Sequence, residues 1–258
     1  MTDIRYTTPW GETYDLTQDH DWTTAIDEAG IDGLVGELTD KTITAVGIPG
    51  HIIDSQAIKP MTGTLEITVS APADQSQQAA DIYAKLRAGF SPLLTGTLEI
   101  ISPLKGRLAT QVRLAGAIPP PTGRPTDENI ITNIKIPLIA DSGIWWTDTF
   151  QAAGTVHITN PGDVTIWPKI KWLGPGGTVT LPSRATFTLP RVAASRTLIL
   201  DNAESCVVLS NPDTIDYDTW RNTSAYAEGI PPNTTCTYTL PSGAHLTWNV
   251  GFLDPWRQ

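Results

Sequence analysis

The chain has 258 residues, of which 40% are hydrophobic and 17% are charged, and its formal net charge is −10. This hydrophobic share is enough for a core and argues against disorder. No run approaches the ~20 apolar residues that cross a bilayer, and the opening residues lack the basic head and apolar stretch of a secretion signal, so neither is expected. The pI near 4.7 argues against sequence-independent binding to nucleic acid, which depends on neutralising phosphates.

Acidic residues are concentrated at the start of the chain. Residues 1–40 contain ten carboxylates and a single basic residue, Arg5, and so carry −9 of the formal charge of −10. From Trp145 onward, seven Lys and Arg stand against nine Asp and Glu, so the second half is close to neutral. One interpretation is a solvated acidic face, and the other is a surface that repels anions or docks a basic partner.

The first half is predicted to form strands and one helix. Residues 65–69 alternate apolar and polar side chains, which indicates a half-buried strand. Pro72 marks a helix start and Gly89 its end, because apolar residues between them recur on one helical face. Further strands are expected at 97–101, 108–114 and 129–140.

A hexapeptide, Thr-Gly-Thr-Leu-Glu-Ile, occurs at 62–67 and again at 95–100. Two copies are too few for a solenoid, which needs at least three repeats. We expect two neighbouring strands that share a glycine entry and an alternating core pattern. The proline-rich stretch 119–125 is expected to be a loop or arm, because proline does not fit a central strand.

The segment 141–148 breaks the pattern, and we place a domain boundary there, between a domain 1–143 and a domain 144–258. Beyond it, short strands and turn signals recur without a helical period. This pattern predicts an antiparallel β-sandwich, with a jelly roll as the favoured form.

Parity along the strand near residue 170 separates two tryptophans. Trp172 shares the parity of its apolar neighbours, which predicts a core position, and Trp167 has the opposite parity, which predicts an exposed or interface position. Pro168 within this run assigns it to an edge strand or a bulge. The stretch Gly174–Gly177 is expected to be a hairpin turn, because it lacks the Lys and Ser or Thr of a phosphate-binding loop.

Catalytic motifs are absent from the sequence, which contains no G-x-S-x-G, H-E-x-x-H or C-x-x-C pattern. The four histidines are scattered, and the acidic stretches 19–21 and 213–218 lack the glycine and terminal Glu of an EF-hand loop. Cys206 and Cys236 could pair across a sandwich, but the favoured expectation is a buried free thiol in each of two strands. We therefore predict a protein that is not an enzyme and that has no cofactor or metal site.

Sugar binding is the main alternative from another class of function. Exposed aromatic faces on a jelly roll can stack on sugar rings, although core or subunit contacts are the competing interpretation. The candidates are Trp145, Trp146, Trp167, Trp172 and Trp220. A glycoside hydrolase would need two carboxylates ~5 to 9.5 Å apart, and the sequence identifies no such pair.

Three stretches, in this order, resemble the distal tail proteins of long-tailed bacteriophages, the Dit-like minor tail proteins of siphophages. The first is Pro-Trp-Gly-Glu at 9–12, followed by a strand–helix–strand unit that ends at 106–114. The second is the junction 136–146. The third, and the most family-like, is Asn-Pro-Gly-Asp at 160–163 with the strand and glycine turn that follow it. One departure is Asn233 where the family pattern has glycine, and asparagine also tolerates a left-handed backbone.

The resemblance implies a mainly β protein with an N-terminal belt domain, similar to a split barrel with one helix, and a C-terminal galectin-like β-sandwich. It implies a structural subunit of the phage tail tip, whose belt domains form a hexameric ring between the tail tube and the baseplate or host-recognition apparatus. The implied partners are other copies of the chain, the tail tube protein, the tape measure and receptor-binding proteins. The protein would be made in the host cytoplasm and lie at the distal end of the virion tail, without contact to a membrane.

Genome DNA would pass through the lumen of such a ring without specific binding. Six copies at −10 each give the ring a formal charge of −60. We expect acidic residues to line the lumen or its rim, so that phosphates slide past, and the candidates are Asp15, Asp19, Asp21, Asp27, Glu28 and Asp32. Interface candidates are Trp10, Trp167 and Pro120. The alternative function is a carbohydrate-binding module that attaches to host-surface glycans.

Overall fold

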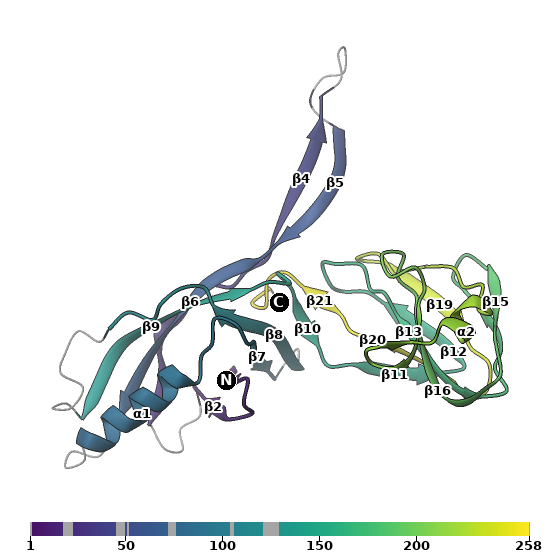
Figure 1. The fold of residues 1–258 in the computed structure, drawn as a ribbon. Coiled ribbons are helices and arrows are strands. Elements are labelled where there is room, and N and C mark those ends of the chain that lie inside the picture. The colour runs from purple at the N-terminus through teal and green to yellow at the C-terminus, as the bar shows by residue number, and fades with distance from the viewer. Residues whose placement is uncertain are drawn as a thin grey trace. The chain divides into compact units, whose positions relative to one another are not determined.

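The computed structural model describes residues 2–257 except 18–22, 45–49, 51, 72–75, 104–105 and 121–128. The chain forms two compact units (Figure 1). Unit 1 comprises Met1–Trp146 and Phe252–Gln258, and unit 2 comprises Thr147–Gly251. The chain therefore leaves unit 1 once and returns to it for its last residues. Neither helix in the described residues is long and apolar enough to cross a membrane.

Unit 1 is built on an antiparallel sheet, which agrees with the mainly β class predicted from the sequence. Its strands follow the order β2-β1-β7-β8-β9-β6-β3, and β10 and β21 pair at the point where the chain passes between the units. Backbone bonds from Leu16 N to Ile4 O and from Ile26 N to Leu16 O, both 2.9 Å, link the first strands to the last. The sheet thus curls until its two edges meet. The bounds are β1 Asp3–Thr7, β2 Thr13–Asp15, β3 Thr24–Gly33, β6 Met61–Ser70, β7 Gly96–Ser102, β8 Gly106–Leu114, β9 Ile130–Ala140, β10 Trp145–Thr147 and β21 Gly251–Phe252.

The alternation of apolar residues explains which face of this sheet is buried. On β6, Leu65, Ile67 and Val69 are fully buried, while the residues between them are half-buried. Because successive side chains of a strand point to opposite faces, this period of two directs one face of the sheet to the core. The strands predicted near residues 65–69, 97–101, 108–114 and 129–140 are confirmed.

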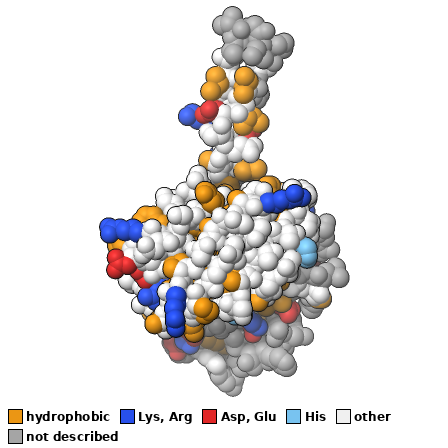
Figure 2. All heavy atoms as spheres, turned by 90° about the vertical axis from the view of Figure 1, so that its right-hand side faces the viewer, with side chains coloured by type: hydrophobic (Ala, Val, Ile, Leu, Met, Phe, Trp, Pro, Cys, Tyr) orange, Lys and Arg blue, Asp and Glu red, His pale blue; other side chains and the backbone are white. Residues whose placement is uncertain are grey.

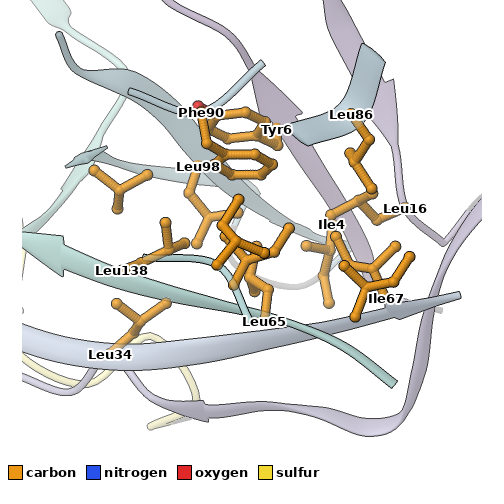
Figure 3. Packing of buried hydrophobic residues seen from close by; sticks show 14 of the residues in the cluster. Ile4, Tyr6, Leu16, Leu34, Leu65, Ile67, Leu86, Phe90, Leu98 and Leu138 are labelled. Atoms are coloured by element: carbon orange, nitrogen blue, oxygen red, sulfur yellow. The ribbon is translucent and has the colours of Figure 1, made fainter. Parts of the chain in front are cut away.

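The core of unit 1 lies between the sheet and helix α1, Ser76–Ala88 (Figure 3). The helix buries Ala79, Tyr83 and Leu86, which lie on one helical face. It ends where predicted, since Gly89 N donates to the carbonyls of Lys85 and Leu86. The predicted start, Pro72, lies outside the described residues.

An aromatic pair joins the first strand to the end of the helix. The rings of Tyr6 and Phe90 stack with centroids 4.2 Å apart and planes 6° from parallel. Figure 3 shows one ring lying over the other. The Tyr6 hydroxyl donates to Gly89 O over 3.1 Å, and burial raises the pKa of this phenol above its ordinary value. The pair therefore fixes the position of the residues that follow the helix.

The repeated hexapeptide does not mark neighbouring strands, and that prediction is wrong. Its copies open β6 and β7, but β8 and β9 lie between these strands in the sheet. The shared pattern reflects two buried strands of the same sheet, each with the same alternation, rather than a pair in contact. Strand order depends on long-range pairing, which a local sequence pattern does not contain.

Unit 2 contains two antiparallel sheets whose buried faces form its core. The six-stranded sheet has the order β11-β20-β13-β16-β17-β18, and the four-stranded sheet has the order β12-β19-β14-β15. Both sheets alternate buried and exposed residues, as a sandwich requires. The bounds are β11 Phe150–Ala153, β12 Thr155–Thr159, β13 Lys169–Gly174, β14 Gly177–Thr180, β15 Thr186–Leu189, β16 Val192–Ile199, β17 Val208–Asn211, β18 Thr214–Ile215, β19 Thr235–Thr239 and β20 Ala244–Trp248.

Two predictions about strand β13 are corrected. Pro168 does not place it at an edge, because β13 pairs with both β16 and β20, and the proline lies just before its first residue. The glycine stretch after β13 is not a hairpin turn. It carries the chain from β13 in one sheet to β14 in the other, with Gly174, Gly176 and Gly177 all at positive φ. A local turn signal does not specify which strands the turn joins.

Buried and exposed tryptophans follow the parity prediction. Trp172 is 1% exposed and its indole N–H donates to Pro190 O over 3.0 Å. Trp167 is 38% exposed, as its opposite parity predicts. Trp145 is also fully buried, with its indole N–H donating to Leu34 O over 2.8 Å in unit 1. Trp145 and Trp172 are therefore removed from the candidates for sugar stacking.

The turn at 160–163 is held by a buried asparagine. Asn160 is fully buried, and its Nδ2 donates to the carbonyls of Val164 and Ile230, each over 2.8 Å. Its Oδ1 accepts from Gly162 N over 2.9 Å. One side chain thus joins the turn to a segment some seventy residues later, beside the isolated bridge between Ile166 and Ile230.

Candidate assembly interface

The longest unpartnered element of unit 1 is a β-ribbon. Strand β4, Glu37–Ile43, pairs with β5, Ile52–Lys59, and the pair leaves the sheet between β3 and β6 (Figure 1). Every residue of β4 is exposed, and so is every residue of β5 except the half-buried Ile58. At about 3.3 Å per residue, β5 extends for roughly 25 Å. We call this element the ribbon.

Aliphatic side chains lie on both faces of the ribbon. Leu38, Ile43, Ile52 and Ile53 are each 47–50% exposed, and Figure 2 shows hydrophobic side chains on its surface. The register places Ile43 opposite Ile52, and Thr42 opposite Ile53 across a bulge. An isolated two-stranded ribbon is marginally stable in water, so these side chains are suited to burial against a partner.

The polar groups of the ribbon interact largely among themselves. Lys59 Nζ lies 3.5 Å from Glu37 Oε2, and Lys41 Nζ lies 3.6 Å from Asp54 Oδ2. Gln56 Nε2 donates to Asp40 Oδ1 over 2.8 Å. Because these groups pair across the ribbon, the aliphatic side chains are the groups left to contact another surface.

Three connecting segments of unit 1 leave the sheet at one end. Thr7 pairs with Thr97 and Gly96 pairs with Val112, so the turn 8–12, the loop 91–95 and the segment 115–118 continue beyond the same row of residues. Leu114 N donates to Ser91 O over 2.9 Å and joins two of them. The ideal Cβ position of Gly96 lies 2.6 Å from Thr7 O, so the strand that leads into the turn 8–12 runs close to the strand that follows the loop 91–95.

Each of these segments exposes apolar side chains, and the charged residue of the turn, Glu12, forms an ion pair with Lys85. Trp10 is 63% exposed, Leu93 87% and Leu94 52%, and Ala115 and Ala117 are exposed beside them. We call these five residues the Trp10 patch. An exposed leucine and an exposed tryptophan at the same end of a sheet are typical of a surface that another molecule covers.

The acidic candidates lie in different environments. Residues 27–30 of β3 stand opposite Glu66 alone, in a bulge where Ala29 has a φ of 58°. This bulge exposes Glu28, whereas Asp27 is half-buried and accepts from the Thr68 hydroxyl over 2.6 Å. Asp32 is exposed farther along β3. The strand thus brings Glu28 and Asp32 to the surface of unit 1.

The other residues predicted to line the lumen or an interface also lie in different environments. Asp15 pairs with Arg5 over 2.5 Å, so its charge is partly neutralised, and Asp19 and Asp21 lie outside the described residues. Trp10 belongs to the Trp10 patch. Pro120 is exposed just beyond it, where Arg87 donates to the carbonyls of Ile118 and Pro119 over 3.0 and 2.9 Å.

Sequence reasoning missed the ribbon and the two leucines of the patch. The ribbon mixes charged, polar and aliphatic residues without a single buried face, so no alternation identified it. Leu93 and Leu94 follow a proline and a serine in a short loop, and a pair of leucines in a loop was the only available signal.

Unit 2 presents a different kind of surface. The outward positions of its four-stranded sheet carry His157 and otherwise threonine: Thr155, Thr159, Thr178, Thr180, Thr186, Thr188, Thr235, Thr237 and Thr239. Hydroxyls of Thr159 and Thr235 pair across strands over 2.9 Å. Figure 2 shows the side that carries β15, on which few charged side chains are visible and those are scattered.

The polar side chains that cluster among the described residues hold turns and helix ends in place. In unit 2, the Thr219 backbone N–H, the Arg196 guanidinium and the Thr219 hydroxyl hold the pKa of Asp216 down, at about 2. Asp216 thereby caps the short helix α2, Tyr217–Arg221, which the sequence did not predict. Within the described ranges, no three His, Cys, Asp or Glu side chains are placed to hold a metal ion.

The two cysteines are free thiols, as predicted. Cys206 is 7% exposed, and burial raises the pKa of its thiol. It lies in the turn before β17 rather than in a strand, whereas Cys236 is half-buried on β19. The prediction that both lie in strands is therefore wrong for Cys206.

Comparison with solved structures identifies the architecture. The crystal structure of SPP1 Dit, described as a paradigm of the hub adsorption apparatus of phages that infect Gram-positive bacteria, matches with a TM-score of 0.63 and 9% identity, over 96% of this chain and 99% of that chain. The chain has the SPP1 Dit fold. A chain of the phage P2 baseplate in its activated conformation with Ca matches with a TM-score of 0.50 and 9% identity, over 97% and 98% of the two chains.

The Dit fold confirms the mainly β class predicted from sequence and the resemblance to distal tail proteins at the level of architecture. No family model matches the sequence, and no curated protein matches it. The similarity to the Dit fold is thus one of structure over nearly the whole chain, carried by residue patterns that differ at about nine positions in ten.

Proposed function

We propose that this chain is a structural subunit of a phage tail tip. In this proposal, copies of unit 1 form a hexameric ring that joins the tail tube to the baseplate or host-recognition apparatus and leaves a channel for DNA. The observation that carries the proposal is the match to SPP1 Dit over 96% of this chain and 99% of that one, which includes both units. The subunit is not an enzyme, and its partners are its own copies, the tail tube protein, the tape measure and receptor-binding proteins.

The surfaces of unit 1 support an assembling subunit. The ribbon exposes aliphatic side chains that nothing in the described residues covers, and the Trp10 patch does the same at the end of the sheet. A closed ring needs two different surfaces on each subunit, because its contacts are head-to-tail. Unit 1 has both within one compact unit.

The test is the assembly state of the full chain. Native mass spectrometry of the purified protein should show a six-fold species, and antibodies to the chain should label the distal end of tails in electron micrographs of the virion. A chain that stays monomeric at every accessible concentration and is missing from purified tails would contradict the proposal.

The acidic residues give the ring a second role in this proposal. Glu28 and Asp32 are exposed on β3, and we place them at the lumen or its rim, where carboxylates repel DNA phosphates. Replacing both by Lys should slow DNA ejection and make it more sensitive to salt, because phosphates would then adhere. The matched control replaces the exposed Asp213 and Asp218 of unit 2 by Lys, which should leave ejection unchanged. Equal effects of the two pairs would refute the lumen assignment.

A second candidate function is attachment of unit 2 to host-surface glycans. Two observations favour it: the exposed rings of Trp167 and Tyr226, and the uncharged threonine face of the four-stranded sheet. The full chain should bind neutral glycans on an array, and Trp167→Ala should weaken that binding at least tenfold. If Trp167→Ala leaves glycan binding unchanged but disturbs ring formation, the residue belongs to an interface instead.

A further inference from the structure

Strand β13 of unit 2 and the residues just before it expose every second side chain. Between Ile166 and Leu173, even-numbered residues are buried and odd-numbered residues are exposed. Because alternate side chains of a strand point to the same face, the exposed ones follow one another on the outer surface of the six-stranded sheet. These residues are Trp167, Lys169, Lys171 and Leu173.

A third basic side chain lies beside the two lysines. The register places His245 of β20 opposite Lys171, and both residues are exposed. Residues directly opposite each other on antiparallel strands have Cβ atoms about 5 Å apart. The other residues that stand opposite the two lysines are uncharged: Thr197, Ile199 and Thr247. We call Trp167, Lys169, Lys171 and His245 the basic row.

The two lysines of the basic row differ from the other described lysines in having no acidic partner. Each of the others forms an ion pair with a carboxylate of unit 1: Lys41, Lys59, Lys85 and Lys135. Neither Lys169 nor Lys171 forms an ion pair with any described residue. In a chain whose formal net charge is −10, two adjacent unpaired lysines beside a histidine make a local site of positive charge.

We infer that the basic row binds a phosphate-bearing glycan, a chain of polyol or sugar units joined through phosphate groups. This inference rests on the second candidate function, attachment of unit 2 to glycans, and names the chemistry of the ligand. A sugar ring stacks on the indole of Trp167, which is 38% exposed, and phosphates lie against Lys169 and Lys171. The two lysines are about 6.8 Å apart along the strand, a separation that suits successive anionic groups of a repeating polymer.

Other anionic partners fit the basic row less well. Protein interfaces are depleted of lysine and favour arginine, and the basic row contains no arginine. Sites for single-stranded nucleic acid combine a basic groove with several aromatic rings, whereas the basic row has one indole in an acidic chain. A phosphate-bearing glycan requires point charges and one ring, and this face supplies both.

Binding of the full chain to a glucose-substituted glycerol phosphate polymer, followed by biolayer interferometry, tests the inference. The affinity should fall between about 50 mM and about 200 mM salt, because the contacts are ionic. The double variant Lys169→Ala/Lys171→Ala should bind about tenfold more weakly. Its matched control, Lys41→Ala/Lys135→Ala, removes two charges from exposed sites of unit 1 and should bind like the natural chain. Equal affinities of the two double variants would refute the role of the basic row.

The indole is tested separately with Trp167→Ala. This variant should bind the glucose-substituted polymer about fivefold more weakly, while its binding to the unsubstituted glycerol phosphate polymer should stay nearly unchanged. The difference is expected because only the substituted polymer has a ring that can stack on the indole. Equal losses for the two polymers would contradict the stacking contact.

Competition distinguishes the other partners. If polyglutamate or oligo(dT) displaces the polymer as effectively as free polymer does at the same concentration of charges, the inference is overturned in favour of an acidic protein segment or a nucleic acid. Binding of neutral glycans alone, with no effect of the lysine substitutions, also overturns it and leaves the second candidate function standing. If no glycan binds, both fail, and the proposed ring depends on none of these results.

Discussion

Replacing Asn160 by Asp isolates the contribution of one buried hydrogen-bonding group in unit 2. The two side chains have nearly the same shape, but Asp has no Nδ2 to donate to the carbonyls of Val164 and Ile230, which now accept bonds of 2.8 Å. Each carbonyl left without a donor in a buried site costs about 1–3 kcal/mol. Ile230 O keeps its backbone bond from Ile166 N over 3.0 Å, so Val164 O is the carbonyl that loses this donor. With that loss, and a carboxylate facing both oxygens, we expect a loss of about 3 kcal/mol in the free energy of unfolding at pH 8.

The stability of this variant should also depend on pH, which gives a second, independent test. Burial and the facing carbonyl oxygens disfavour the ionised Asp, so its folded pKa should lie above its unfolded pKa of about 3.9. A raised folded pKa favours the folded state below the unfolded pKa, and this gain is lost as pH rises through the folded pKa. The destabilisation of Asn160→Asp relative to the natural chain should therefore be smaller at pH 4 than at pH 8.

Urea unfolding at several pH values measures both effects, with the transition of unit 2 followed by tryptophan fluorescence and hydrogen exchange. Asn202→Asp is the matched control, because Asn202 is exposed in the turn before β17 and the change there should stay within about 0.5 kcal/mol. A loss below about 1 kcal/mol for Asn160→Asp, with no dependence on pH, would refute the role assigned to these hydrogen bonds.

Two further changes test other parts of the fold. The folded pKa of Asp216 is about 2, so its carboxylate stabilises the folded state above the unfolded pKa and loses this contribution as pH falls toward 2. The Asp216→Asn variant should therefore be less stable than the natural chain at pH 7. Acid unfolding followed by circular dichroism should lack the part of the transition that is due to this residue. Gly143→Ala should cost several kcal/mol, because the ideal Cβ lies 2.1 Å from Lys59 O at a φ of +66°, whereas Gly154→Ala, at +74° with open space, should cost only about 1–2 kcal/mol. Equal melting-temperature shifts for the two alanine variants would show that crowding at Gly143 is absorbed elsewhere.

The candidate assembly surfaces show where local patterns fail. The sequence analysis selected Trp10 and Pro120, which are exposed, but the leucines of the Trp10 patch come from a loop some eighty residues from Trp10. The sheet register brings these segments to one end, and register is a property of long-range pairing rather than of either segment alone. The ribbon escaped notice because neither of its faces is buried within the chain, so no periodic apolar pattern marks it.

The sequence by itself determined the elements whose residues alternate between core and solvent. The period of two in β6, β7, β8 and β9, the end of helix α1 at Gly89, and the opposite fates of Trp167 and Trp172 all follow from which side chains must leave water. Only the tertiary structure decided that the chain returns to unit 1 for its last residues, that the turn after β13 changes sheets, and that Asn160 bonds to Ile230. These features join residues far apart in the chain, and their energies depend on the pairing of strands, on which local periodicity carries no information.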